Sequence, residues 1–240
     1  YGRAQLKGSY DMTNTTVLYQ HGTLALLVPG LLAGTLTMGE LLQHGDTGIG
    51  TGEGLEGELI ILDGTPDQVD SAGRVNVVAD AFTLPFANSH FAAYKPLMTV
   101  IAATRSAVEK QILATAEQPN IFFSVKLTGT FTDVTTRAVA KSQPPYDSLA
   151  ETARHQSIFK RKQVEGTLLS YYAPQLFDGV AVGGFHHHFL SADHDFGGHL
   201  LEFGQASGTV MIQTFATLEQ HFPVADAAYQ HHDFSQDNIM

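Results

Sequence analysis

The sequence has 240 residues, of which 43% are hydrophobic and 15% charged, and this balance is typical of a globular protein and excludes a disordered chain. The formal net charge of -11, with no run of Lys and Arg to offset it, opposes binding to phosphate backbones and argues against nucleic acid as a partner. The absence of cysteine excludes disulfides and thiolate metal ligands, and it fits the expectation of a cytoplasmic protein. No apolar stretch is long enough to span a bilayer, so we expect no membrane partner.

The beginning of the chain is expected to form short helices and loops. A polar lead-in covers 1–14, and apolar residues then predict a helix over 17–27, which Pro29 ends. A capping-box pattern predicts a second helix over 38–44. The glycine-rich stretch 45–54 lacks the Gly-Lys-Ser/Thr ending of a phosphate-binding loop, so it indicates a flexible turn that lets the backbone approach a site.

The following segments predict strands around one longer helix. The predicted strands are 58–62, 74–78, 98–102, 121–127 and 130–139. Asp63-Gly64 is a hairpin-type turn signal after the first strand, and the last two are expected to turn at Gly129. A helix capped by Ser106 is predicted over 106–117. Its apolar residues at helical spacing are Val108, Ile112 and Leu113, and the core candidates of the strand pair are Val125, Leu127 and Phe131.

The Pro144-Pro145 pair interrupts the pattern and marks a loose boundary between an N-terminal half, 1–143, and a C-terminal half, 144–240. A helix is predicted over 148–159. Strands separated by short turns are then predicted at 164–172, 180–190, 199–203 and 209–215. These elements predict an α+β fold with mixed β-sheets in two halves, short helices and a strand-rich C-terminal half, and the halves could form one compact unit.

The most informative motif is the run His186-His187-His188, followed by His199 at the start of the next predicted strand. Residues two apart in a strand share a face, so His186 and His188 face one side and His187 the other. If the two strands are neighbours, His199 meets the pair. Three neutral imidazoles that leave a coordination position open are the ligands of a catalytic zinc ion, although other divalent transition metals also accept imidazole. A histidine pair at this spacing is by itself a weak signal, and the expected surface histidines are His194, His231 and His232.

Longer blocks of sequence surround these histidines and occur earlier in the chain. The blocks are Leu41-Leu42-Gln43-His44-Gly45-Asp46, Gly48-Ile49-Gly50-Thr51, Leu55-Glu56-Gly57-Glu58-Leu59-Ile60, Gly129-Thr130-Phe131, Thr135-Thr136-Arg137, Gly184-Phe185-His186-His187-His188-Phe189 and Gly197-Gly198-His199-Leu200-Leu201. Together they resemble the α-acetolactate decarboxylase family over nearly the whole chain, from about Val17 onward. The combination is far more specific than the histidines alone.

The resemblance implies a mixed αβ architecture with two sheet-containing halves, a catalytic zinc ion and a homodimer. By motif, the residues that match the family's metal ligands are His186, His188 and His199. Glu58 matches an acidic active-site residue, Thr51 a threonine that lines the same site, and Arg137 the active-site arginine. The family usually also carries an active-site glutamate several residues beyond a stretch resembling 233–240. Either a longer chain supplies this residue or the activity is altered.

The function implied by the resemblance is decarboxylation of 2-acetolactate to acetoin and CO2. Loss of CO2 leaves electrons that delocalise onto the neighbouring ketone as an enediolate, and a divalent ion stabilises this charge as a Lewis acid. Arg137 would hold the substrate, and Glu58 would transfer a proton. Two alternatives stay open: a metal-dependent hydrolase acting at the same histidines, and a small-molecule binding protein with a degenerate site. Without the family, Glu58 and Arg137 could simply pair with surface charges.

Overall fold

The computed structural model of the chain describes residues 14–237. The polar lead-in expected over 1–14 therefore lies outside the described residues, except for Asn14. Mixed β-sheets with a few short helices make up the described part of the chain, which confirms the predicted α+β class. No helix within residues 14–237 has both the length and the apolar character needed to cross a membrane.

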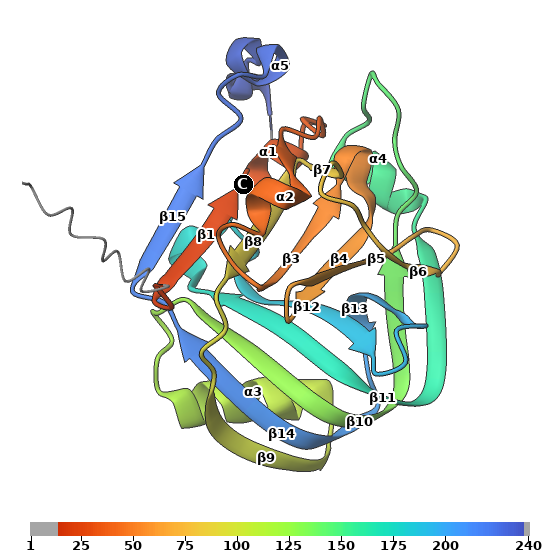
Figure 1. The fold of residues 1–240 in the computed structure, drawn as a ribbon, viewed down its shortest axis with the longest axis vertical. Coiled ribbons are helices and arrows are strands. Elements are labelled where there is room, and N and C mark those ends of the chain that lie inside the picture. The colour runs from red at the N-terminus through yellow and green to blue at the C-terminus, as the bar shows by residue number, and fades with distance from the viewer. Residues whose placement is uncertain (1–13, 238–240) are drawn as a thin grey trace, which may run out of the picture.

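One sheet, of seven strands over the described residues, occupies the upper part of Figure 1. In spatial order its strands are β15 (Thr217–His221), β1 (Val17–His21), β8 (Phe86–His90), β3 (Thr47–Gly52), β4 (Glu56–Leu62), β5 (Thr65–Val69) and β6 (Val75–Val77). Only the β1–β15 pair is parallel among these neighbours. Asp63 and Gly64 join β4 to β5 with φ angles of 51° and 77°, which confirms the predicted hairpin turn.

The second sheet has six strands over the same described residues and contains the two longest strands. In spatial order these are β11 (Ser157–Ala173), β12 (Gly184–Ser191), β13 (Gly197–Glu202), β10 (Phe123–Ala138), β14 (Gln205–Thr214) and β9 (Lys95–Ala103). Because β10 also pairs with β11, the strands β10 to β13 form a closed ring of pairings. The short strands β2 (Leu36–Thr37) and β7 (Thr83–Leu84) form a separate two-stranded sheet. Each sheet takes strands from both sides of residue 143, and the division into two halves there stays a prediction.

Helices are short apart from one that covers the six-stranded sheet. They are α1 (Leu24–Leu27), α2 (Met38–Leu41), α3 (Arg105–Ala116), α4 (Leu149–Arg154) and α5 (Ala227–His231), with 3₁₀ turns η1 (Glu53–Leu55), η2 (Gln175–Phe177) and η3 (Phe234–Gln236). The capping box of α2, between Thr37 and Glu40, is confirmed. In α3 the cap is Thr104, not Ser106, because the Thr104 side chain accepts from the third backbone N–H of the helix.

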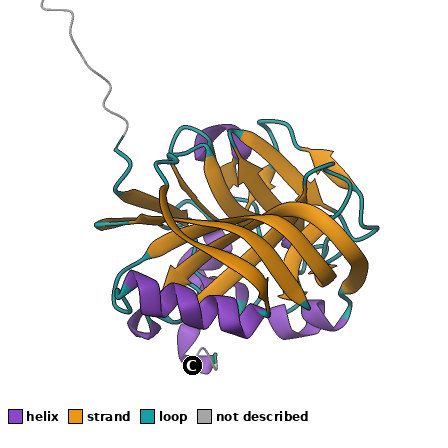
Figure 2. Cartoon of the chain, turned by 90° about the horizontal axis from the view of Figure 1, so that it is seen from below, coloured by secondary structure: helices purple, strands orange, loops and turns teal. Residues whose placement is uncertain are grey.

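Two apolar clusters pack against opposite faces of the six-stranded sheet. One lies between the sheet and α3, which crosses the outer face of the strands in Figure 2. The predicted core residues Val125, Leu127 and Phe131 belong to it, each at most 1% exposed. The other cluster lies between the two sheets and includes Ile60 and Leu190. The strands that carry the histidine motif are therefore packed on both faces, and such close packing restricts their movement.

The helix predicted over 17–27 is wrong for its first half, where the chain forms β1. This strand lies between β15 and β8, and Leu18 and Tyr19 are both buried although they face opposite sides. Burial on both faces removes the alternation that marks a strand in a sequence. The helical part shrinks to α1, which starts where the Thr23 side chain accepts a hydrogen bond from the N–H of Leu26.

The flexible loop predicted over 45–54 is also wrong, because Thr47–Gly52 is the fully buried strand β3. Its glycines allow close approach to β8. A Cβ on Gly48 would lie 2.3 Å from the carbonyl oxygen of Asn88, and one on Gly50 would lie 2.7 Å from that of Phe86. Glycine in a strand interior here marks tight packing of two backbones and not a turn.

The strand pair predicted to turn at Gly129 is a single strand, β10, that runs from Phe123 to Ala138. Gly129 faces Gly208 of β14, where the two backbones approach closely. The helix predicted over 148–159 ends at Arg154, and β11 begins at Ser157. The alternating side chains at the start of β11 follow the helical residues without a Gly or Pro to separate them.

We expect Gly129→Ala to lower the free energy of unfolding by about 1–3 kcal/mol, the usual cost of overpacking. The added Cβ would lie 2.1 Å from the carbonyl oxygen of Ser207, and neither backbone can move without breaking strand pairing. Urea unfolding followed by circular dichroism measures the change. Thr128→Ala, at an exposed neighbour on the same strand, is the matched control. Equal midpoints for Gly129→Ala and the wild-type protein would contradict this account of β10.

Candidate metal centre

The three predicted histidines converge in the structure. His186 and His188 lie on β12, and His199 lies on β13 as the direct pairing partner of His188. Each offers one ring nitrogen, and these three atoms lie within 4.8 Å of one another. The ring centroids are 5.0 to 5.4 Å apart. The convergence predicted from the spacing is confirmed, and the cluster can hold a metal ion.

His188 has the hydrogen-bonding pattern of a metal ligand. Its Nδ1 lies 2.8 Å from the carbonyl oxygen of Leu59, which can only accept, so Nδ1 carries the hydrogen and Nε2 carries a lone pair. Nε2 is buried and has no hydrogen-bond partner among the described residues. The nearest carboxyl oxygen, Glu58 Oε2, is 3.3 Å away but not in hydrogen-bond geometry. A cation between the imidazoles would satisfy this lone pair, and the Leu59 carbonyl fixes the tautomer that such binding requires.

The charge state of the three rings also fits metal binding. Burial is the main cause that lowers the pKa of His186 and of His199 well below the ordinary value, and mutual repulsion among the rings lowers them further. Burial lowers the pKa of His188 to about 3. At neutral pH the three imidazoles are therefore uncharged, which is the form that ligates a metal.

Glu58 and Arg137 lie beside the histidines and come from different sheets. Glu58 is on β4, and Arg137 is on β10 as the pairing partner of His199. Arg137 Nη1 lies 3.4 Å from Glu58 Oε1. Burial raises the pKa of Glu58 to about 7, although the Arg137 charge opposes this shift. The Glu58 carboxyl thus lies between a guanidinium group and the free nitrogen of His188, where it can carry or release a proton near neutral pH.

Thr51 lines the same pocket from β3, where it pairs directly with Glu58 on β4. Its hydroxyl donates to the carbonyl oxygen of Gly57 at 2.8 Å. This bond fixes the side chain and leaves the hydroxyl oxygen as an acceptor. All six residues predicted for the site therefore line one cavity.

The cavity has a volume of about 250 Å³, which suits a small substrate. Its polar residues are on the two sheets, and the remaining wall is apolar. The apolar lining residues are Leu24, Leu27, Leu55, Phe86, Val139, Leu149, Ala153 and Val182. The sequence did not predict this apolar wall. Its residues come from α1, from α4 and from Val139 directly after β10, which are distant in the chain, and no local pattern marks them as pocket residues.

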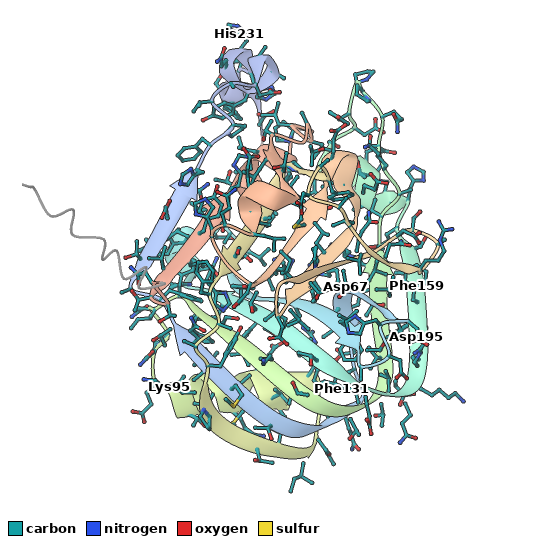
Figure 3. The ribbon with its side chains drawn as sticks, viewed as in Figure 1. Asp67, Lys95, Phe131, Phe159, Asp195 and His231 are labelled. Carbon is teal, nitrogen blue, oxygen red and sulfur yellow. The ribbon has the colours of Figure 1, made fainter. Side chains whose placement is uncertain are left out.

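The three histidines predicted to be surface residues are at least partly exposed. His194 has a half-exposed side chain that lies 3.1 Å from Asp67 Oδ2. His231 is exposed at the outer end of α5 (Figure 3). His232 is only partly exposed, because its Nε2 lies 2.6 Å from Asp237 Oδ2. None of the three belongs to the metal-binding cluster among the described residues.

Two packed sheets with a histidine-lined pocket, a buried carboxyl group and an arginine are the features of an α+β enzyme that acts on a small molecule. The alpha-acetolactate decarboxylase family model matches residues 18–236. The chain belongs to this family, which confirms the resemblance in the sequence blocks.

Relatives and solved structures agree with this assignment. The chain is 36% identical over 222 residues to the alpha-acetolactate decarboxylase of Lactococcus lactis subsp. lactis, covering 91% of this chain and 92% of that protein. The crystal structure of the alpha-acetolactate decarboxylase from Bacillus subtilis strain 168 superposes with a TM-score of 0.87 at 30% identity, covering 92% of this chain and 94% of that one. A Staphylococcus aureus protein described as similar to alpha-acetolactate decarboxylase gives the same TM-score at 36% identity, covering 90% and 94%.

Proposed function

We propose that this chain decarboxylates 2-acetolactate to acetoin and CO2 with a divalent metal ion held by His186, His188 and His199. The observation that carries the proposal is the buried Nε2 of His188, which has no hydrogen-bond partner among the described residues and points into a cluster of neutral imidazoles. Zinc is the ion we propose, since three imidazoles suit it. Lewis-acid stabilisation of the enediolate left by CO2 loss is the chemistry that an ion supplies at this site.

Arg137 has the proposed role of holding the substrate. Its guanidinium can donate two parallel hydrogen bonds to a carboxylate or to adjacent oxygens, and its side chain is partly buried beside the cavity. Its benefit is orientation, because tight binding of the reactant carboxylate alone would not lower the barrier to CO2 loss.

Glu58 has the proposed role of the proton donor. The bond to CO2 breaks, and its electron pair delocalises onto the neighbouring ketone. A proton must then reach the hydroxyl-bearing carbon to give acetoin. The raised pKa of Glu58 lets its carboxyl carry this proton near neutral pH. Thr51 and the apolar wall position the small substrate and limit the access of water to the reactive carbon.

We propose a cytoplasmic homodimer that acts on a small molecule without a nucleic-acid or membrane partner, as the composition and the family resemblance imply. We also propose that the chain is divided into an N-terminal half, 1–143, and a C-terminal half, 144–240. Light scattering after gel filtration tests the dimer.

We expect Arg137→Lys to lower kcat/KM by roughly 10–100-fold, since a charge-assisted hydrogen bond contributes about 1.5–3 kcal/mol. The loss should appear in kcat, because the substrate is less well oriented, as well as in KM. Lysine keeps the charge but loses the planar pair of donors. Acetoin formation at varied acetolactate concentration measures both constants. The control Arg154→Lys alters an exposed arginine on α4. A wild-type KM in Arg137→Lys would remove the proposed holding role.

The experiment that tests the proposed function offers the protein acetolactate and, separately, a panel of esters and amides. We expect stoichiometric CO2 and acetoin from acetolactate and no hydrolysis. Hydrolysis without acetoin would support the metal-dependent hydrolase instead. Thermal stabilisation by acetolactate without turnover would support a binding protein.

A further inference from the structure

The side of β12 that faces away from the pocket carries a buried polar residue, His187. It is 5% exposed and lies on the side where Phe185 and Phe189 pack with the cluster under α3. Both ring nitrogens have partners. Nδ1 lies 2.6 Å from Ser170 Oγ, and Nε2 lies 2.9 Å from Glu109 Oε1 on α3. Since a carboxylate only accepts, Nε2 carries the hydrogen and donates to Glu109.

A chain of charged groups continues from Glu109 to the other ligand strand. Arg105, one turn earlier on α3, donates from Nη1 to Glu109 Oε1 at 3.1 Å. The same guanidinium donates from Nε to Glu202 Oε1 at 3.3 Å. Glu202 is the last residue of β13, the strand of His199. The series His187, Glu109, Arg105 and Glu202, which we call the α3 brace, therefore links β12 to β13 through α3.

Strand pairing alone does not fix all three histidines relative to one another. The ladder between β12 and β13 runs from Leu190 with Gly197 to His188 with His199 and ends there. His186 lies beyond this ladder and pairs only with Tyr171 of β11. Beyond the ladder the two rings meet directly, with His186 Nε2 3.3 Å from His199 Nδ1, so their spacing depends on how β12 and β13 are held. The α3 brace attaches to His187, the residue next to His186.

We propose that Glu109 and Arg105 are positioning residues that hold β12 and β13 at the separation that the metal ligands require. This proposal rests on the metal site of the proposed function. The brace contacts neither the pocket nor the ligand rings, so its effect passes through the position of the strands. Partners bonded directly to metal ligands typically contribute 10–100-fold to metal affinity, and the α3 brace, which acts one residue away from a ligand, is expected at the lower end of this range.

The test measures Co2+ affinity by competition with a chelator and the visible absorption spectrum of the Co2+ protein. We expect Glu109→Ala to weaken Co2+ binding by about 10-fold, the lower end of the range for direct partners of ligands, and to shift the spectrum. Glu109→Gln, which keeps an acceptor oxygen for His187, should recover part of the affinity. If Glu109→Ala does not fold, Arg105→Ala replaces it in the test, because Arg105 is partly exposed. This variant should also weaken Co2+ binding.

Val108→Ala separates positioning from general destabilisation. Val108 is buried on the same helix and makes only apolar contacts in the cluster, so its loss lowers the melting temperature without breaking the brace. We expect wild-type Co2+ affinity and spectrum in Val108→Ala and in Lys110→Ala, at an exposed α3 position.

The outcomes separate this inference from the proposed function. Wild-type Co2+ affinity in Glu109→Ala, or equal weakening in Val108→Ala at a similar melting temperature, would overturn the α3 brace while leaving the metal site intact. A wild-type protein that binds no Co2+ would overturn both.

Discussion

We expect His188→Ala to lose its metal ion and almost all acetoin formation. His188 is 1% exposed, and its Nδ1 is fixed by the Leu59 carbonyl with Nε2 directed to the cluster. Removal leaves two imidazoles, too few for a site that keeps a position open for substrate. We expect the turnover rate to fall by at least about 10³-fold, beyond the 10–100-fold typical of an outer-shell partner. Elemental analysis after dialysis and an acetoin assay on the same sample measure both effects.

The control for this substitution is His155→Ala, at a histidine whose side chain is 76% exposed. It should keep both metal and activity. Circular dichroism shows whether His188→Ala retains the fold, since loss of a buried ring also costs packing. An unchanged metal-to-protein ratio in folded His188→Ala would contradict the ligand set.

The second large effect is expected for Glu58→Gln, which should keep the metal but lose most of the turnover. Glutamine preserves the size of the side chain and can still accept from Arg137, but it cannot release a proton. General acid–base groups contribute about 10²–10⁴-fold, and we expect a loss of this size in kcat. Steady-state acetoin kinetics and metal content together measure the result.

Glu56→Gln is the matched control, because Glu56 is on the same strand, more exposed, and paired with Lys141 at 3.3 Å. It should behave as the wild-type protein. If Glu58→Gln decarboxylates at the wild-type rate, Glu58 has no role in proton transfer. If it loses the metal as well, Glu58 acts on the metal site and not only on the proton.

The histidine motif was predictable because strand geometry is simple. His186 and His188 share a face by the two-residue period of a strand, and a short connection returns the chain to His199. Glu58, Thr51 and Arg137 have no such local signal. They were predicted because the sequence segments that contain them resemble the family. In the structure these residues meet because Thr51 pairs with Glu58 and Arg137 pairs with His199.

Elements were missed where burial or close backbone approach removed the usual pattern. Leu18 and Tyr19 are buried on both faces of β1, so no alternation distinguishes that strand from a helix. Gly48 and Gly129 indicate turns in a sequence, but here they allow two strands to pack closely. These are contacts between distant segments, which a local pattern does not contain.

The hydrogen-bond and packing partners of the site residues could not be predicted from the sequence either. His187 was correctly predicted to face away from the pocket, but its partner Glu109 lies 78 residues earlier on α3. The apolar wall from Leu24 to Val182 likewise requires the folded chain. Local patterns therefore identify metal-binding residue types, whereas the second layer of contacts that positions them depends on tertiary packing.

The most direct test of the central claim is a metal titration of protein stripped with a chelator. Zinc is added in small steps while acetoin formation from acetolactate is measured. We predict no activity without metal, and a linear rise that stops at one ion per chain. Full activity in the stripped protein, or a plateau unrelated to one ion per chain, would contradict catalysis by a single ion at His186, His188 and His199.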